Sequence, residues 1–284
     1  KFALGLHKKG SFYDILNTDE CMIVHPDFNV IKNSVRDYFD EYYLRRQVDF
    51  YNTRTHEGYL RHLLVRRTSA TGEILVALVT SSSDKSSVVS KADEAGMISG
   101  FAEMLMKLNL SGRIVGAFHI TNDALADVVK SDTMANLFGR SYIVEKILGL
   151  EFRISVFSFF QTNSAGAEIL YSKAKEFALD GTDGPVKVIY DLYCGTGTIT
   201  QIMSPAAEKV IGIEIVEEAV EAAKENALLN GIENAEFITG DVMKILNGEE
   251  GADLPRPDLI ILDPPREGVH PKALKKILNY GVDK

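Results

Sequence analysis

The chain has 284 residues, of which 45% are hydrophobic and 25% are charged, a composition typical of a globular protein with room for two domains. Its net charge of −9 argues against a general nucleic-acid coat protein, which needs an excess of Lys and Arg. We expect no membrane span and no signal peptide, and because Cys21 and Cys194 do not form a disulfide framework, we predict a cytoplasmic protein.

Residues 1–157 carry the pattern of a mixed α+β domain. Residues 58–81 predict two strands joined by a Thr-Gly turn, and residues 91–110 have the apolar spacing of a helix. Further strands are predicted at 113–121 and 151–160. These elements indicate a mostly antiparallel sheet.

Residues 158–284 change to an alternation of helices and strands. A helix is predicted at 166–179, with Ser164 as its N-cap, and four apolar strands follow, each leading into a helix. Such alternation predicts βαβ units and a parallel, doubly wound, Rossmann-like sheet. In these sheets ligands bind at the carboxyl ends of the strands.

A glycine-rich turn follows the first of these strands, in the stretch DLYCGTGTIT at 191–200. Gly195 and Gly197 allow the backbone to approach a ligand closely. The third glycine of the dinucleotide fingerprint is replaced by Thr200, which argues against NAD. Asp191 suits a cofactor that carries a cationic ammonium group.

Acidic residues also follow the next three strands. Glu214 can accept hydrogen bonds from both hydroxyls of a ribose. Asp241 can accept one from an adenine amino group or can cap the following short helix, and the residues leave both open. Asp263 ends the last strand, where Pro264 and Pro265 stiffen the turn. Together these strand ends predict an S-adenosylmethionine-dependent methyltransferase.

Six stretches resemble, in order, the motifs of the RNA uracil-carbon-5 methyltransferases: GLHKKGSFYDI, GYLRHLLVR, SFFQTN, DLYCGTGT, GIE and LDPPREG. That family makes 5-methyluridine in 23S rRNA or tRNA. The resemblance covers nearly the whole chain and implies an enzyme of class EC 2.1.1 that methylates carbon-5 of a uridine, with 23S rRNA favoured over tRNA. LDPPREG is quite specific, because enzymes that methylate amino groups and have a related Asx-Pro-Pro turn usually have an aromatic residue where this chain has Arg266.

The resemblance also implies roles for individual residues. Gln161, on one face of the predicted strand with Phe157 and Phe159, matches a glutamine beside the methionine moiety, although it could be a plain polar strand end. Tyr193 matches a loop aromatic next to the cofactor, and Thr198 stands where many members have Asn. The predicted cofactor residues are Gln161, Asp191, Tyr193, Gly195, Gly197, Thr198, Glu214, Asp241 and Asp263.

The segment 45–67 holds six arginines against two acids, although the net charge of the chain is negative. Scattered arginines on a solvated sheet face would explain this, and so would a local phosphate-facing surface. Because GYLRHLLVR is family-like, the predicted RNA contacts are Arg54, Arg61, His62, Arg66 and Arg266.

In the family resembled, a cysteine thiolate adds to carbon-6 of the uracil and a glutamate acts as base. Their motifs would follow Lys284, so we expect no catalytic residue here and no activity of residues 1–284 alone. Cys194 does not replace the missing nucleophile. It lies inside the cofactor loop, where a small side chain is needed, so we interpret it as a small packing residue. Cys21 matches the last ligand of an iron–sulfur cluster found in some members, and one thiolate cannot hold a cluster, so such a cluster would need a longer chain.

Other classes stay open. The chain could methylate an amino group of a nucleobase or protein, or it could be a non-catalytic RNA-binding module with a methyltransferase-like fold. A nicotinamide dehydrogenase is disfavoured by Thr200 and by the Pro-Pro turn. We expect a monomer that binds RNA and no membrane.

Overall fold

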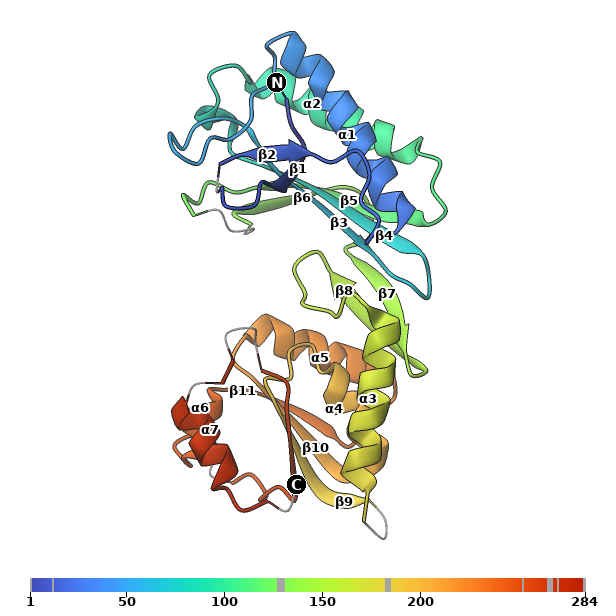
Figure 1. Ribbon diagram of the computed structural model, residues 1–284, viewed down its shortest axis with the longest axis vertical. Coiled ribbons are helices and arrows are strands. Elements are labelled where there is room, and N and C mark those ends of the chain that lie inside the picture. Colours follow the sequence, from blue (N-terminus) through green and yellow to red (C-terminus); the bar gives the residue numbers. More distant parts are fainter. Residues whose placement is uncertain are drawn as a thin grey trace. The chain divides into compact units, whose positions relative to one another are not determined.

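The computed structural model describes residues 2–11, 13–126, 131–181, 185–251, 253–264, 268–269 and 271–282. Its contacts divide the chain into two compact units, Lys1–Ile143 and Val144–Lys284 (Figure 1). The division predicted from the sequence falls at 157/158, fourteen residues later, on the far side of a β-hairpin that belongs to the second unit by its contacts.

The N-terminal unit is a four-stranded sheet covered on one face by two helices (Figure 1). The strands β3, β4, β5 and β6 are adjacent in that order; β4 and β5 run parallel, and the two outer pairs are antiparallel. A separate hairpin joins β1 to β2. The elements are β1 (Gly5–His7), β2 (Ile15–Asn17), α1 (Pro26–Leu44), β3 (Leu60–Arg67), β4 (Glu73–Thr80), a 3₁₀ turn (Ser83–Lys85), α2 (Lys91–Met106), β5 (Arg113–Thr121) and β6 (Thr133–Gly139).

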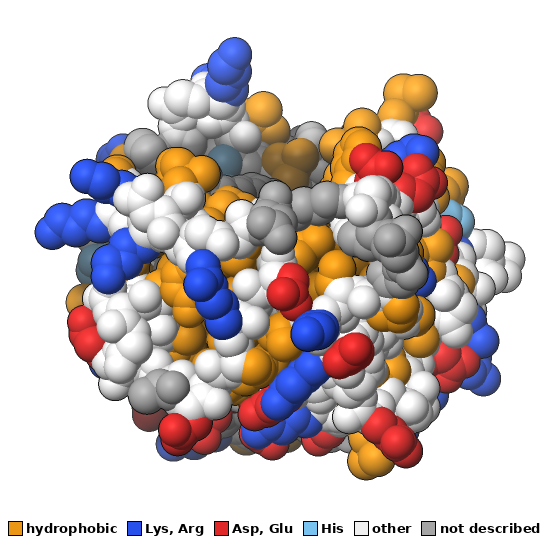
Figure 2. All heavy atoms as spheres, turned by 90° about the horizontal axis from the view of Figure 1, so that it is seen from below, with side chains coloured by type: hydrophobic (Ala, Val, Ile, Leu, Met, Phe, Trp, Pro, Cys, Tyr) orange, Lys and Arg blue, Asp and Glu red, His pale blue; other side chains and the backbone are white. Residues whose placement is uncertain are grey.

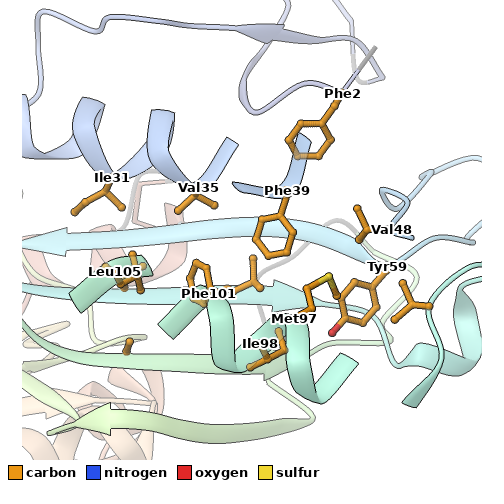
Figure 3. Packing of buried hydrophobic residues seen from close by; sticks show 14 of the residues in the cluster. Phe2, Ile31, Val35, Phe39, Val48, Tyr59, Met97, Ile98, Phe101 and Leu105 are labelled. Atoms are coloured by element: carbon orange, nitrogen blue, oxygen red, sulfur yellow. The ribbon is translucent and has the colours of Figure 1, made fainter. Parts of the chain in front are cut away.

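The core of this unit lies between the helices and the sheet (Figure 3). Ile31, Val35 and Phe39 recur every fourth residue on α1 and are almost fully buried, facing Phe101 and Leu105 of α2. Burying each such side chain stabilises the fold by about 1.5–3 kcal/mol. The predicted mixed α+β class is therefore confirmed.

A hairpin of β7 (Tyr142–Ile147) and β8 (Leu150–Ser155) begins at the boundary between the units. Its two turn residues, Leu148 and Gly149, both have positive φ, which suits a type I′ turn. Strand β8 ends at Ser155, because Ser155 and Ser158 exchange backbone-to-hydroxyl hydrogen bonds of 3.2 Å that close a turn. The predicted strand at 151–160 was therefore too long, and Gln161 lies on no strand.

The C-terminal unit is a parallel sheet in the order β11-β10-β9-β12, with α6 and α7 packed on one face and α5 on the other (Figure 1). This arrangement confirms the predicted Rossmann-like sheet. The elements are α3 (Ser164–Leu179), β9 (Val186–Leu192), α4 (Thr198–Met203), a 3₁₀ turn (Ser204–Ala206), β10 (Ala207–Glu214), α5 (Glu217–Leu229), β11 (Ala235–Thr239), α6 (Val242–Leu246), β12 (Leu259–Leu262) and α7 (Pro271–Leu278).

The N-cap of α3 lies one residue before the predicted one, and the helix begins at Ser164 instead of at 166. Asn163 is the N-cap, and its side chain accepts a 3.0 Å hydrogen bond from the amide of Gly166. The hydroxyl of Ser164 is buried and donates instead to Glu145 on β7, at 2.8 Å. Ser164 thus fastens the helix to the hairpin.

The surface of the C-terminal unit is partly apolar. Figure 2 shows hydrophobic side chains gathered in the middle of one face, between charged margins. Helix α3 exposes Ile169, Leu170 and Phe177, and α7 exposes Leu274 and Leu278. Within the described residues, no helix combines the length and the apolar character that a membrane span requires.

Candidate cofactor site at the carboxyl ends of the parallel strands

The register of the sheet brings the ends of three strands to one level. Leu192 on β9 pairs with Ile213 on β10 and with Leu262 on β12. The residues that follow these three are Tyr193, Glu214 and Asp263, so the three emerge together at the carboxyl edge. The chain leaves β9 for β10 and β11 on one side and returns to β12 on the other, which makes the β9/β12 border the topological switch point.

The two glycines of the loop after β9 serve different purposes. Gly197 has φ 74°, and a Cβ there would lie 2.5 Å from the Phe237 ring and 2.8 Å from Ala223, so only glycine lets the loop pack so closely. Gly195 has φ 54°, and a Cβ there would meet open space. Tyr193 also has positive φ, 66°, a rare conformation for a side-chain-bearing residue that is typical of functional loops.

Asp191 lies beneath this loop with no exposed surface. One carboxylate oxygen accepts a 2.6 Å hydrogen bond from the Thr200 hydroxyl, and the other is buried without a partner among the described residues. Burial raises the pKa of Asp191 to about 7; the hydrogen bonds of Thr200 oppose this, and the charges of Asp263 and Glu214 add to it. A carboxylate with an unpartnered buried oxygen, among like charges, is suited to a nearby cation.

Glu214 ties the loop to the turn that follows β10. One carboxylate oxygen accepts a hydrogen bond from the Gly195 amide at 3.1 Å, and the other accepts from the amides of Ile215 and Val216 at 2.9 and 3.0 Å. A carboxylate has about four acceptor positions, so Glu214 keeps capacity for a ligand hydroxyl.

Asp241 caps α6, as one of its two sequence interpretations expected. Its side chain accepts a 2.7 Å hydrogen bond from the amide of Met243. It also lies close to Tyr193, since burial and then the charge of Asp241 raise the pKa of that tyrosine. Capping engages one oxygen, and the other oxygen is compatible with a ligand contact.

Gln161 lies in the segment between β8 and α3. The hydroxyl of Thr196, in the glycine loop, contacts the carbonyl of Phe159 at 3.5 Å, which brings this segment beside the loop. Gln161 lies beside Tyr171 on α3, close enough that its side chain lowers the pKa of that tyrosine. Burial and the charge of Asp263 raise the pKa of Tyr171 to about 12, against the effect of Gln161, so this tyrosine lies near Asp263 as well.

Tyr171 is a residue that the sequence interpretation missed. It is 4% exposed and sits on the buried side of α3, so in the sequence it resembles any core aromatic. Nothing in its local pattern indicates that it lies beside Gln161, because the two residues belong to different parts of the chain.

Cys194 is unsuited to nucleophilic catalysis. Burial raises the pKa of its thiol, and the charges of Asp191 and Glu214 raise it further. A Cβ on Gly212 of β10 would lie 2.8 Å from its sulfur, so Cys194 packs directly on that strand. This agrees with the prediction that its role is packing.

The predicted RNA contacts in the N-terminal unit lie on β3 and just before it. Arg61, His62 and Arg66 are half-buried on β3, and burial lowers the pKa of Arg66. Arg54 is exposed in the preceding loop, stacked on the ring of Tyr13. Arg266 lies outside the described residues, as does Pro265.

Arg67, the last arginine of the segment 45–67, and Cys21 both make contacts within the N-terminal unit. Arg67 donates a 3.0 Å hydrogen bond to Asp27 and so fastens β3 to the start of α1. The backbone of Cys21 is held by Asn29 through two hydrogen bonds of 2.9 and 3.1 Å. Among the residues that the structure describes, no three His, Cys, Asp or Glu side chains are grouped as a metal site would require.

Comparison with known proteins adds three findings. Residues 185–280 match the family model of a methyltransferase domain. Over its full length, the chain is 48% identical to a protein of Caldanaerobacter subterraneus subsp. tengcongensis named an uncharacterized RNA methyltransferase, and covers 58% of it. Over 277 residues, 97% of the chain, it is 39% identical to a similarly named protein of Bacteroides thetaiotaomicron, and covers 57% of it.

Among solved structures, the chain is similar to the tRNA (uracil-54, C5)-methyltransferase of Pyrococcus abyssi in complex with S-adenosyl-L-homocysteine. The TM-score is 0.69 and the identity 23%, over 98% of this chain and 60% of that one. This likeness shows the fold, which is that of S-adenosylmethionine-dependent methyltransferases, and the predicted cofactor agrees with it. The chain spans a little under three fifths of the length of the curated relatives it matches.

Proposed function

Because the chain is a homologue of proteins named RNA methyltransferases and contains a methyltransferase domain, we propose that this protein methylates RNA with S-adenosylmethionine as methyl donor. The observation that supports this most is the group of carboxylates at the switch point. Burial is the main cause of the raised pKa of Asp191, and the charges of Asp263 and Glu214 raise that pKa further; a cationic cofactor would relieve the repulsion among the three carboxylates.

The residues present fit this cofactor. Beside Gly195 there is open space where a side chain would stand, and the unpartnered oxygen of Asp191 lies beneath the same loop. Asp191 and Glu214 would hold the ammonium group and the ribose. Asp241 would accept from the adenine amino group, and Gln161, which lies beside Tyr171, would lie beside the methionine moiety.

When bound, S-adenosylmethionine supplies an electrophilic methyl group. The chain's own contribution is to bind and orient it at the edge of the sheet beside Asp263. Since the thiol of Cys194 is disfavoured as a thiolate, the attacking group must be the substrate or a residue other than Cys194.

We propose further that the methylated atom is carbon-5 of a uridine, with 23S rRNA as the substrate. The support is the ordered set of motifs from GLHKKGSFYDI to LDPPREG, which resembles the uracil-carbon-5 family. The Pyrococcus abyssi protein, a tRNA (uracil-54, C5)-methyltransferase, carries out the same chemistry on tRNA.

The experiment is methyl transfer by the full-length protein, with methyl-labelled cofactor and unmodified transcripts of 23S rRNA and tRNA. Digestion to nucleosides and mass spectrometry should place the label in 5-methyluridine from the rRNA. Label in tRNA alone would correct the substrate but keep the reaction. Label on nitrogen, or in protein, would contradict the proposal.

A further inference from the structure

The N-terminal unit contains a cavity of about 680 Å³. It lies between the β1–β2 hairpin, the segment 50–54 and β3. Its walls include Phe39 of α1, Leu63 of β3 and Leu78 of β4, which belong to or pack against the hydrophobic core. Volumes of 300–1,000 Å³ with apolar walls and a few polar groups are typical of small-ligand pockets.

Two arginine–tyrosine stacks also line the cavity. The guanidinium carbon of Arg54 lies 4.0 Å from the ring centre of Tyr13, and that of Arg61 lies 3.9 Å from the ring centre of Tyr51. Tyr13 comes from the β1–β2 hairpin and the other three residues come from the segment 51–61, and the fold brings the two pairs to one cavity. Flat cationic and aromatic groups are the side chains on which unstacked nucleobases lie.

One of these stacks is held rigidly before any ligand arrives. Arg61 donates to the carbonyl oxygen of Asn122 at 2.6 Å and to that of Ala126 at 3.4 Å. The Tyr51 hydroxyl makes a 3.0 Å hydrogen bond to the ring of His56. The Nε atom of Arg61 is buried without a partner among the described residues, so this guanidinium retains a donor. A preorganised stack loses little side-chain entropy on binding.

We propose that this cavity binds an unstacked base of single-stranded RNA, with a neighbouring phosphate against Arg54. A base has two apolar faces for the tyrosine and arginine planes, and its edge carries acceptors for a guanidinium donor. Two arginines against the single acid Asp14 in the lining favour an anionic partner over a neutral peptide. A duplex does not fit a concave site, because its bases are stacked inside it.

This inference rests on the proposed function, since that function takes RNA as the substrate. The inference adds the place in the chain where unpaired RNA is held. It concerns the N-terminal unit and uses none of the residues assigned to the cofactor.

The test measures binding of a fluorescein-labelled 12-nucleotide oligouridylate to the chain by fluorescence anisotropy, over a range of salt concentrations. An oligomer of the same length without bases serves as the second probe. We expect the oligouridylate to bind at least tenfold more tightly than the abasic oligomer, because stacking on bases contributes in addition to phosphate contacts.

The variants separate stacking from charge. Tyr51→Leu should weaken oligouridylate binding about tenfold and leave the salt slope unchanged, and Tyr13→Leu, at a 54% exposed position that tolerates change, should act in the same direction. Arg54→Met should weaken binding of both oligomers and reduce the salt slope by about one. Matched controls are Tyr142→Leu, from the Arg140–Tyr142 stack outside the cavity, and Arg113→Met, at an exposed arginine.

The possible results distinguish the two proposals. If the unmodified chain binds oligouridylate and the Tyr13, Tyr51 and Arg54 variants bind as well as the controls, the cavity proposal is overturned and the proposed function stands. Equal binding of the abasic oligomer also overturns it. If the unmodified chain binds neither oligomer, the RNA substrate itself is contradicted.

Discussion

Thr200 donates a 2.6 Å hydrogen bond to Asp191, and the second oxygen of that carboxylate is buried with no partner in the described part of the chain. The threonine stands where a dinucleotide-binding fingerprint has its third glycine. A Cβ on Gly212 would lie 2.8 Å from the Thr200 hydroxyl, so the bare backbone of β10 makes room for this pair. Thr200, which argues against a dinucleotide cofactor, thus also positions Asp191, the carboxylate that suits a cationic cofactor.

Cofactor affinity should depend on the ionisation of Asp191. Its pKa of about 7 in the free protein means that the site is partly protonated at neutral pH. A bound cation stabilises the ionised form, so affinity for S-adenosylhomocysteine should rise as the pH increases from 5.5 to 7.5 and level off above. Calorimetric titrations in two buffers of different ionisation enthalpy should detect proton release below pH 7.

The control is a pair of neutral replacements. Asp191→Asn should bind more weakly and with little change in affinity between pH 5.5 and 7.5, whereas Asp241→Asn should keep the pH dependence. An Asp191→Asn protein with the same pH profile as the unmodified chain would show that another group titrates.

The two loop glycines should respond differently to alanine. Gly197→Ala combines a positive φ with contacts of 2.5 and 2.8 Å and should cost about 3 kcal/mol of unfolding free energy. Gly195→Ala has the φ penalty alone and should cost roughly 1 kcal/mol, but it should block the cofactor. The matched control is Gly231→Ala, also at positive φ with open space around the added Cβ. It should be destabilised as much as Gly195→Ala and should bind the cofactor as the unmodified chain does. Urea unfolding and ligand titration measure both; equal stability of the Gly197 and Gly231 variants would refute the packing argument.

The parallel strands and the glycine loop could be read from the sequence, because a strand buried on both faces is a continuous apolar run bounded by turn residues. Val186–Leu192 is such a run apart from Lys187 and Asp191, and the glycine loop follows it as predicted. The segment after β8 could not be read in this way. Phe157 and Phe159 alternate as in a strand, but they are 44% and 70% exposed; Phe157 lies within the turn closed by Ser155 and Ser158, and Phe159 follows it.

Two further features needed the three-dimensional structure. Helix α1 was not predicted, although Ile31, Val35 and Phe39 have the spacing of one buried face. Its start is marked weakly, since the N-cap is His25 rather than Ser, Thr, Asp or Asn. Gln161 and Tyr171 lie side by side although they belong to different parts of the chain, and no local sequence pattern predicts that they are neighbours.

Glu214 should matter for stability and for binding. The amide of Gln offers one oxygen where the carboxylate offers two, so Glu214→Gln cannot satisfy the amides of Gly195, Ile215 and Val216 together. We expect a loss of roughly 1 kcal/mol in unfolding free energy and at least tenfold weaker S-adenosylhomocysteine binding. The control is Glu208→Gln, at the opposite end of the same strand, where neither quantity should change. Full affinity of the Glu214 variant would remove this residue from the site.

Asp27 should stabilise the N-terminal unit only above acidic pH. Burial alone would raise its pKa, but hydrogen bonds from Ser111, Arg67 and Gly112 outweigh burial and hold the pKa at about 2. Because this lies below the ordinary value of 3.8, the stabilisation is complete above pH 4 or so and is lost as the pH falls through 2.

Asp27→Asn should therefore cost roughly 2 kcal/mol at pH 7 and progressively less between pH 4 and 2. Denaturant unfolding followed by circular dichroism at several pH values measures this difference. Asp37→Asn, at a 72% exposed side chain, should leave stability unchanged throughout. A constant difference between the Asp27 variant and the unmodified chain at every pH would mean that charge is not the cause.

The central claim is that the polar groups at the carboxyl ends of β9, β10, β11 and β12 form one cofactor site. The most direct measurement is a titration of the ¹⁵N-labelled chain with S-adenosylhomocysteine, followed by amide chemical shifts. The account predicts that the shifts concentrate at Gln161, in the loop 193–198, and at Glu214, Asp241 and Asp263. Shifts spread over a different surface, or none at millimolar ligand, would contradict it.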